Sequence, residues 1–301
     1  MKTGVGQAHA KVILIGEHSV VYQHPALSLP FKALQVKVII KPSQGTTLVS
    51  TLHEGDLDSA PDILNPIIHL IRNLQEHFNL QGCEINTDSN IPLGAGLGSS
   101  AALASAITKA FYHGMEVELN DQTLLQWIHV SETMAHGQPS GVDALTTSFD
   151  SAWIFTKGQP PVSLPLSLNA FLVIAQTMQQ GSTKEAVQKV ANKVSQEGLK
   201  SIDELGLLSH HALKYIKDNE LELLGKTLTQ AHEVLKHLGI STKTLDQCVE
   251  QALKHHALGA KLTGGGLGGC MIALAKDQAS ANEIMSTLKE ITPHVWSMSL
   301  Q

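Results

Sequence analysis

Short runs of β-branched and aliphatic residues, bounded by Gly, Pro or Asn, recur in the first third of the chain and predict β-strands. We expect these strands at KVILI (11–15), LQVKVII (34–40), TTLVST (46–51) and CEINT (83–87). One helix is expected among them, over about residues 62–78. Ile67, Leu70 and Leu74 recur there at helical spacing, shortly after Pro61.

Longer helical patterns follow in the middle of the chain. They predict one helix over about residues 99–113, ending at Gly114, and a second over about 121–135, ending at Gly137. SAWIFT, at 151–156, is then expected to return as a strand.

A proline-rich segment, TKGQPPVSLPLSLN (156–169), holds three prolines and few charges, which suits a connection between domains. We therefore expect an N-terminal domain over 1–168 and a C-terminal domain over 169–301. The second begins with a strand at FLVIAQ (171–176) and continues with three or four helices over about 183–257. A strand, a glycine run, a strand, a helix and a strand close the chain. This irregular order predicts an α+β fold rather than a doubly wound sheet.

Composition narrows the classes of partner. The chain has 301 residues, 43% of them hydrophobic, and its net charge is 21 − 27 = −6. No basic stripe of the kind that nucleic acids require is present. The cysteines are odd in number, form no CxxC pair and suit reduced thiols: Cys83, Cys248 and Cys270. No secretory leader and no run near the ~20 apolar residues of a membrane span is found. We expect a cytoplasmic protein without nucleic-acid or membrane partners.

The stretch IPLGAGLGSS (91–100) places glycine at every second position and then enters an alanine-rich helical run. Glycines that adopt positive φ turn consecutive N–H groups toward one point, and a helix start adds its free N–H groups and positive dipole end. An anion cradle is one interpretation. A flexible turn with an ordinary serine cap is the other. The stretch is neither a GxxxxGK[ST] loop nor a GxGxxG motif.

A second glycine cluster, KLTGGGLGGC (261–270), holds five glycines between two expected strands. A plain hairpin needs only one or two. The excess indicates close backbone approach to another group, whereas the alternative is a long mobile loop.

Two further segments supply charged side chains: AKVILIGEHSVVYQHPAL (10–27) and SETMAHGQPSGVDALTT (131–147). The first has Lys11 at the start of an apolar strand and Glu17 just past its end; the second has Glu132 late in a helix and Asp143 near the start of another. Taken alone, each carboxylate would be interpreted as a solvent-exposed side chain or as a helix cap. Together with a phosphate cradle, they are the parts that Mg-dependent phosphoryl transfer requires.

These segments, in this order, closely resemble the GHMP family of small-molecule kinases, named for galactokinase, homoserine kinase, mevalonate kinase and phosphomevalonate kinase. The resemblance spans Lys11 to Cys270. Within the family, KVILIGEHSVVYQHPAL looks like the mevalonate kinase branch, since galactokinases carry Arg and Asn before GEH and phosphomevalonate kinases usually have Tyr in place of His18. The resemblance implies an N-terminal mixed-sheet domain, similar to ribosomal protein S5 domain 2, and a C-terminal ferredoxin-like domain. It also implies a homodimer.

The family implies a role for each matching residue. Asp143 would accept the proton of the C5 hydroxyl of mevalonate, and Lys11 would pair with Asp143 and steady the moving phosphoryl group. Glu132 and Ser100 would hold Mg²⁺ against the phosphates of ATP. The phosphate-binding stretch would comprise Pro92, Leu93, Gly94, Ala95, Gly96, Leu97, Gly98, Ser99 and Ser100.

On the acceptor side, the resemblance places Glu17, His18 and Thr183 near mevalonate. Glu17 would contact the residues that bind mevalonate rather than mevalonate itself. An imidazole at His18 would bind either the carboxylate or the hydroxyls, depending on its protonation. Two positions depart from the family. His9 and Ala10 stand where Pro-Gly is usual before the strand lysine, and Leu267 stands where a glycine is common in the third motif.

The alternatives are a different acceptor and a non-catalytic relative that binds nucleotide. A phosphorylated acceptor such as phosphomevalonate would call for extra basic residues, and Arg72 is the only arginine. A non-catalytic relative would have lost Asp143, Lys11 or Glu132, and all three are present.

Overall fold

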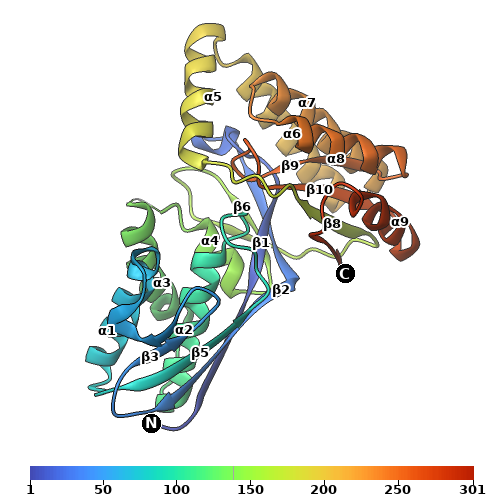
Figure 1. Ribbon diagram of the computed structural model, residues 1–301. Coiled ribbons are helices and arrows are strands. Elements are labelled where there is room, and N and C mark those ends of the chain that lie inside the picture. Colours follow the sequence, from blue (N-terminus) through green and yellow to red (C-terminus); the bar gives the residue numbers. More distant parts are fainter. Residues whose placement is uncertain (138) are drawn as a thin grey trace. The chain divides into compact units, whose positions relative to one another are not determined.

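The structure, a computed structural model, describes residues 1–137 and 139–301 (Figure 1). The described residues form two compact units. The first comprises Met1–Lys11, Pro30–Pro92 and Gly98–Asp150, and the second comprises Val12–Leu29, Leu93–Leu97 and Ser151–Gln301. The expected domains, 1–168 and 169–301, stay a prediction, because this grouping does not test where independently folding domains begin and end.

The first unit is built on strands of mixed direction. β3 pairs parallel with β5, whereas β5 pairs antiparallel with β2 and β4 pairs antiparallel with β3. β1 also pairs with β2. Among the described residues this sheet has seven strands, and its first five are β1 (Gly4–Ile15), β2 (Ala26–Pro42), β3 (Thr47–Val49), β4 (Glu54–Asp56) and β5 (Cys83–Ser89). The mixed sheet expected for the N-terminal half is thus confirmed.

Strand β1 begins seven residues before the predicted KVILI run. Its early positions alternate between buried and exposed, but the buried ones are small: Gly4, Gly6 and Ala8. The two glycines let helix α2 (Ser99–Met115) approach closely, since a Cβ on either would lie 2.0 Å from a carbonyl oxygen of that helix. A strand whose inward face is glycine and alanine gives no hydrophobic signal, which is why the sequence shows only its second half.

Helices of the first unit pack against one another beside these strands (Figure 1). The alanine-rich face of α2 is buried, including Ala101, Ala104 and Ala106. Small side chains permit this close helix packing. The helix predicted over 62–78 consists of a 3₁₀ turn, Asp62–Leu64, followed by α1, because Pro66 occupies the first turn of the α-helix. The remaining helices are α1 (Asn65–His77), α3 (Asp121–His136) and α4 (Val142–Ser148); a further 3₁₀ turn spans Leu57–Ser59.

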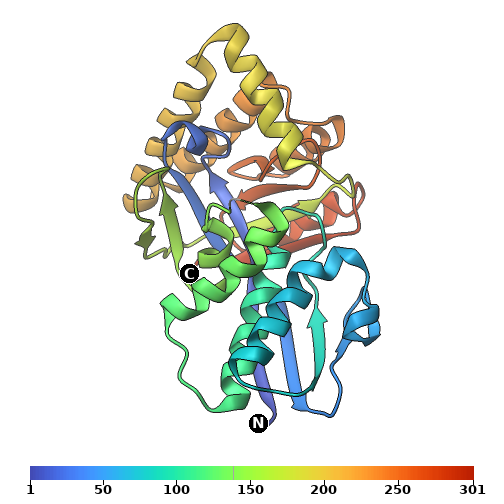
Figure 2. The same ribbon diagram turned by 90° about the vertical axis from the view of Figure 1, so that its left-hand side faces the viewer.

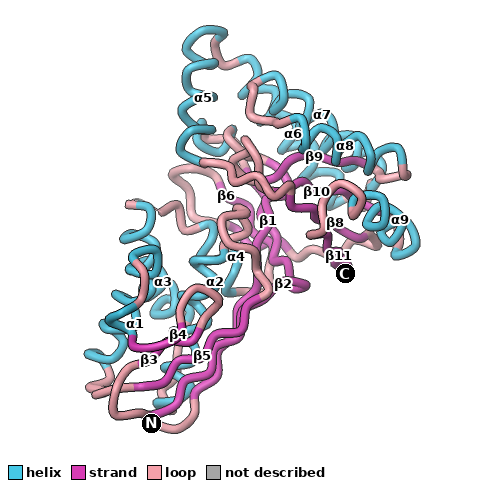
Figure 3. The backbone as a smooth tube through the Cα atoms, in the orientation of Figure 1, coloured by secondary structure: helices cyan, strands magenta, loops and turns pink. Residues whose placement is uncertain are grey.

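The second unit contains a four-stranded antiparallel sheet in the order β11-β8-β10-β9 (Figure 3). Four helices connect its first two strands, and one helix connects its last two. This order and connection make the ferredoxin-like arrangement that the family implied. The elements are β8 (Phe171–Gln176), α5 (Thr183–Glu197), α6 (Lys200–Lys217), α7 (Leu221–His237), α8 (Lys243–Lys254), β9 (Gly259–Thr263), β10 (Cys270–Ala275), α9 (Gln278–Leu288) and β11 (Val295–Ser299).

Every residue of β9 and β10 is buried, and α7 and α8 contact β9. The turned view in Figure 2 shows how the chain reverses from α5 into α6 within this unit. The same unit contains a 3₁₀ turn, Ser19–Tyr22, and two strands, β6 (Ala152–Phe155) and β7 (Val162–Leu164). β7 pairs with β6 and lies within the proline-rich segment that suits a connection between domains, and the sequence analysis did not predict this strand. Among the described residues, no helix is long and apolar enough to cross a membrane.

Candidate functional site

Lys11 and Asp143 form an ion pair in the first unit. The Lys11 Nζ lies 3.0 Å from Asp143 Oδ1. Lys11 comes from β1, and Asp143 lies in the first turn of α4, which begins after Gly141 at φ +79°. The lysine side chain is only 8% exposed and the aspartate 37%. A cation that is nearly buried requires such a partner, whereas the carboxylate still reaches solvent and could meet a ligand.

Gly98 brings the start of helix α2 against this pair. Its φ is +75°, and a Cβ there would lie 2.8 Å from Cγ of Lys11 and 2.9 Å from Cγ2 of Thr147. Only glycine fits without displacing those side chains. Gly98 caps α2 without a side-chain hydrogen bond, so the cap residue supplies no side-chain acceptor to the N–H groups of the first turn, which begins at Ser99. Free N–H groups and the positive end of the helix dipole bind anions such as phosphate.

Ser100, in the same first turn of α2, contacts Glu132. The Ser100 hydroxyl donates to Glu132 Oε1 at 2.8 Å, joining α2 to α3. Glu132 is 4% exposed. A hydroxyl and a carboxylate are oxygen donors of the kind that Mg²⁺ prefers, and Mg²⁺ in kinases usually takes one or two protein ligands plus phosphate oxygens. Among the described residues no group of three or more His, Cys, Asp or Glu could hold a metal.

The rest of the predicted phosphate stretch, Leu93–Leu97, belongs to the second unit. Gly94 and Gly96 have φ of +67° and +76°, and both Ala95, which lies between them, and Leu97, which follows Gly96, are buried. The Cys270 thiol donates to the Ala95 carbonyl at 3.5 Å. The stretch is therefore anchored by its small apolar side chains, and its glycines supply the turns. Pro92 ends the preceding segment of the first unit.

Residues predicted near the acceptor gather in the second unit. His18 Nε2 lies 2.9 Å from the Gly265 carbonyl oxygen. Thr183, the first residue of α5, packs on Gly265, since a Cβ there would lie 3.0 Å from its hydroxyl. Burial lowers the pKa of His18, against the opposing effects of the Gly265 hydrogen bond and of Glu17. The second glycine cluster thus adjoins both His18 and Thr183, as close backbone approach requires.

Lys261 was missed by the sequence analysis as a site residue. It lies in β9, it is fully buried, and its Nζ donates to Glu17 Oε1 at 2.5 Å. Burial lowers the pKa of Lys261, opposed by Glu17. The sequence contained a signal for this residue, because a lysine within the otherwise apolar strand GAKLT needs a buried partner.

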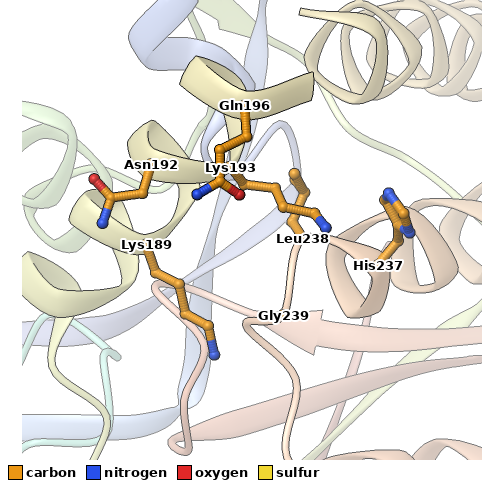
Figure 4. A pocket seen from close by; sticks show the side chains of 7 residues that line it. All are labelled: Lys189, Asn192, Lys193, Gln196, His237, Leu238 and Gly239. Atoms are coloured by element: carbon orange, nitrogen blue, oxygen red, sulfur yellow. The ribbon is translucent and has the colours of Figure 1, made fainter. Parts of the chain in front are cut away.

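A cavity of about 250 Å³ lies elsewhere in the second unit, between α5 and the end of α7 (Figure 4). Two of its side chains, Lys193 and His237, are already paired with Glu197. None of the predicted site residues lines it, so we do not place the reaction there. Its lining consists of Lys189, Asn192, Lys193, Gln196, His237, Leu238 and Gly239.

The three cysteines are free and buried, as expected for reduced thiols. Burial raises the pKa of Cys83 and of Cys270 to about 12 and that of Cys248 to about 11. Thiols protonated at neutral pH are poor nucleophiles and poor metal ligands. The cysteines therefore contribute packing rather than chemistry.

Two models of known protein families match this sequence. The sequence matches the GHMP kinases N terminal domain over residues 65–150 and the GHMP kinases C terminal family over residues 212–293. The first match contains Gly98, Ser100, Glu132 and Asp143, and the second contains Lys261.

Individual relatives cover nearly the whole chain. A mevalonate kinase from Thermococcus sibiricus is 32% identical, with 95% of this chain and 92% of the relative aligned. One from Thermococcus gammatolerans is also 32% identical, over 98% and 96%. Among solved structures, the mevalonate kinase of Methanococcus jannaschii has a TM-score of 0.85 at 27% identity, covering 99% of this chain and 98% of that one. The L. major mevalonate kinase in complex with R-mevalonate shares the fold, with a TM-score of 0.84 at 22% identity over 100% and 97%.

Proposed function

The chain belongs to the GHMP kinase family, and we propose that it transfers the γ-phosphoryl group of ATP to the C5 hydroxyl of mevalonate, giving 5-phosphomevalonate and ADP. The similarity to mevalonate kinases over nearly the full chain supports this acceptor. The observation that carries the chemistry is the Lys11–Asp143 ion pair beside Gly98, at the start of a helix whose cap residue supplies no side-chain acceptor.

In this proposal Asp143 accepts the proton of the C5 hydroxyl as that oxygen attacks the γ-phosphorus. The new oxygen–phosphorus bond forms while the bond to the leaving ADP oxygen breaks. Lys11 orients the Asp143 carboxylate and places a positive charge near the transferring group. Because the transition state of phosphoryl transfer is loose in most analyses, positioning matters, and the Asp143 carboxylate would also orient the alcohol.

Residues Pro92 to Ser100 bind the phosphates of ATP in this proposal, with backbone N–H groups as donors. Ser100 and Glu132 would hold Mg²⁺, which would supply positive charge to offset that of the phosphates. Glu17, His18 and Thr183 belong to the acceptor side. A homodimer and a cytoplasmic location stay predictions.

A phosphorylated acceptor is not favoured. Arg72, the only arginine, forms an exposed ion pair with Asp58 in the first unit. It therefore already has a carboxylate partner. The similarity to mevalonate kinases points the same way.

The test is ADP release by the purified protein with MgATP and four separate acceptors: mevalonate, 5-phosphomevalonate, homoserine and galactose. We expect turnover with mevalonate alone. Turnover with a different acceptor would retain the kinase chemistry and reject the substrate. No turnover with any of the four would favour a relative that binds nucleotide without catalysis.

A further inference from the structure

Helix α4 is short, and side chains of one strand contact it at both ends. It has seven residues, about two turns, so a tilt at one end displaces the other. Lys11 of β1 pairs with Asp143 in its first turn. His9 stands two positions earlier in β1, and its Nε2 lies 3.4 Å from Oδ1 of Asp150, just after the last turn. Residues two apart in a strand share one face, so both side chains leave β1 on the side of α4.

Lys109 of α2 attaches the same C-terminal end of α4. Its Nζ donates to the Ser148 carbonyl at 2.9 Å and to the Gln7 carbonyl at 3.2 Å. The last carbonyls of a helix have no partner within it, and a lysine near the end can satisfy them. The Ser148 hydroxyl also donates to the Ser105 hydroxyl at 2.9 Å. One ammonium thus joins α2, β1 and α4, the elements that carry the proposed phosphate-binding, lysine and aspartate side chains.

Asp150 supports the positive charges at this end of the helix. Burial lowers the pKa of Lys109, and Asp150 opposes that effect. Burial also lowers the pKa of His9, and Asp150 opposes the effect there too. The other carboxylate oxygen, Oδ2, lies 3.0 Å from Nζ of Lys32 in β2. Asp150 therefore interacts with basic side chains from three elements around the end of α4.

The proposed reaction gives none of these side chains a role. His9 stands where the family resemblance implies a proline, and a proline ring has no second nitrogen that could approach Asp150. The His9 side chain is only 12% exposed, and Lys109 is half-buried. Polar groups that are shielded from water need partners, and here the partners all belong to or adjoin α4 and β1.

We propose that His9, Lys109 and Asp150 form an anchor at the C-terminal end of α4, and that they are positioning residues which keep Asp143 aligned with Lys11. This inference rests on the proposed function and adds residues that touch neither substrate. A helix of this length measures about 10 Å, so a tilt of about 6° moves its far end by about 1 Å. A misplacement of that size can lower a rate about 10²-fold.

The first test removes the cation of the anchor. Lys109→Met keeps the length of the side chain but loses both hydrogen bonds. We expect kcat with mevalonate and MgATP to fall about tenfold or more, while the KM for ATP stays within about threefold of the parent. Lys109→Arg retains a cation with several donors and should recover most of kcat. Parental kcat in Lys109→Met, or an equal loss in Lys109→Arg, would overturn the proposal.

The second test removes the carboxylate and has a matched control. The side chains of Asp150 and Asp58 are 76% and 80% exposed, and each pairs with a basic residue of the same unit. Asp150→Asn should lower kcat about threefold or more, whereas Asp58→Asn should keep the parental value. Both variants should keep their thermal midpoints, because exposed pairs contribute little to stability. Equal kcat in the two variants would exclude Asp150 from positioning.

A double variant tests whether His9 acts through Asp150. If the two side chains work through one contact, His9→Ala combined with Asp150→Asn should lose no more kcat than the worse single variant. Losses that multiply would show that His9 acts independently and would contradict its place in the anchor. All rates are measured well below the thermal midpoint of each variant, so that unfolding does not contribute.

Hydrogen exchange follows the same helix without any substrate. The Leu145 and Phe149 N–H groups donate to the carbonyls of Gly141 and Leu145. In Lys109→Met these two amides should exchange about tenfold or more faster than in the parent, while the amides of β10 in the second unit stay unchanged. Unchanged exchange at α4 would overturn the anchor.

The proposed function and the anchor fail in different ways. If the parent protein phosphorylates no acceptor, the proposed function is wrong and the catalytic role of the anchor falls with it, even where exchange at α4 rises. If the parent turns over mevalonate and Lys109→Met changes neither kcat nor exchange, only the anchor is wrong. Should Lys109→Met fail to fold, the comparison of Asp150→Asn with Asp58→Asn decides.

Discussion

The ion pair between Lys11 and Asp143 explains why a lysine stands at the start of the apolar half of β1. Lys11 fills space beside Gly98 with its methylene groups and presents its ammonium to a carboxylate that still reaches solvent. The Asp143 side chain is 37% exposed, so an acceptor hydroxyl could reach it, as the proposed role requires.

Asp143→Asn should therefore lower kcat by about 10²–10⁴-fold, the range that a positioned proton acceptor contributes. The amide keeps the size of the side chain but removes its charge. We expect the KM for ATP and the thermal midpoint to stay close to the parent values, since the helix start that would bind phosphate is not altered. Steady-state kinetics and thermal unfolding measure both, and near-parental turnover would reject the role.

Lys11→Met is expected to reduce kcat to a similar extent. The methionine preserves the packing against Gly98, while the charge beside Asp143 is lost. Lys2→Met is the matched control, because Lys2 pairs with Glu116 on the surface of the same unit and such exposed pairs contribute little. Parental kcat in Lys11→Met would remove this lysine from the mechanism.

Glu132→Gln should raise the Mg²⁺ concentration needed for half-maximal activity, because a neutral amide is a weaker ligand for a hard cation. The Ser100 hydrogen bond can still form, so the fold should be retained. A titration of activity with Mg²⁺ at saturating ATP gives the comparison. An unchanged Mg²⁺ requirement would place the metal on other residues.

Leu267 shows how a departure from the family pattern is accommodated. It adopts φ +59°, the left-handed region that glycine enters without cost, and its N–H donates to the Ile240 carbonyl. A glycine, which the family resemblance implies is common at this position, would adopt this conformation without cost, whereas here a leucine adopts it. His9 and Ala10 need no such explanation, since they lie within β1, where no turn is required.

Helix α2 depends on a glycine at its start for a reason specific to its neighbours. Gly98 and Gly96 have nearly equal φ, +75° and +76°, but only Gly98 faces side chains. A Cβ at Gly96 would meet nothing within 4 Å. The two positions thus separate the cost of backbone conformation from the cost of contact.

Gly98→Ala should lower the thermal midpoint and reduce kcat/KM for ATP by about tenfold or more. Both alanines pay roughly 1–2 kcal/mol for the left-handed conformation. Gly98→Ala adds overpacking against Lys11, roughly 1–3 kcal/mol, and displaces the proposed catalytic lysine. Gly96→Ala is the control. Equal effects in the two variants would mean that contact with Lys11 is unimportant.

Helix α7 and strand β9 are joined by a buried histidine. The Leu262 N–H donates to Nδ1 of His232 at 3.3 Å, and the other ring nitrogen lies 3.2 Å from Asp246. Nδ1 must be unprotonated to accept, so the ring is neutral despite its carboxylate neighbour. Burial accordingly lowers the pKa of His232 from 6.5 to about 4.

This histidine makes stability depend on pH. As pH falls below 6.5, the unfolded chain binds a proton at His232 while the folded protein does not until about pH 4. Stability is therefore full above pH 6.5 and falls by up to about 3 kcal/mol toward pH 4. His232→Asn should show a smaller drop in thermal midpoint between pH 7 and pH 5 than the parent does. His210→Asn, at an exposed position of α6, should keep the parental drop, and equal drops in all three proteins would reject the assignment.

Across the whole molecule, the elements that the sequence predicted are those with strong hydrophobic periodicity. β8 spans the predicted residues 171–176, and α3 ends within a residue of its predicted end. The strands and the part of β1 that the sequence analysis did not predict were missed for physical reasons. β4 and β7 are three residues long and mostly exposed, and the first half of β1 buries only small side chains. Length and side-chain size, rather than burial itself, limited the prediction.

The site was predictable to the extent that its chemistry is local in the sequence. Glycine spacing and helix starts identified Gly98 and Ser100. The pairing of Lys11 with Asp143, 132 positions apart, came from a resemblance and not from spacing. The Glu17–Lys261 pair joins residues 244 positions apart, and no periodicity reveals a contact of that kind.

The most direct test of the account is the position of the phosphate in the product, measured by phosphorus NMR of the protein incubated with MgATP and mevalonate. Transfer to the C5 hydroxyl predicts a phosphomonoester signal split into a triplet by the two protons on C5. An unsplit signal, as from an ester on the tertiary C3 oxygen or from an acyl phosphate, would contradict the proposed acceptor group, and the absence of any new signal would contradict the proposed activity.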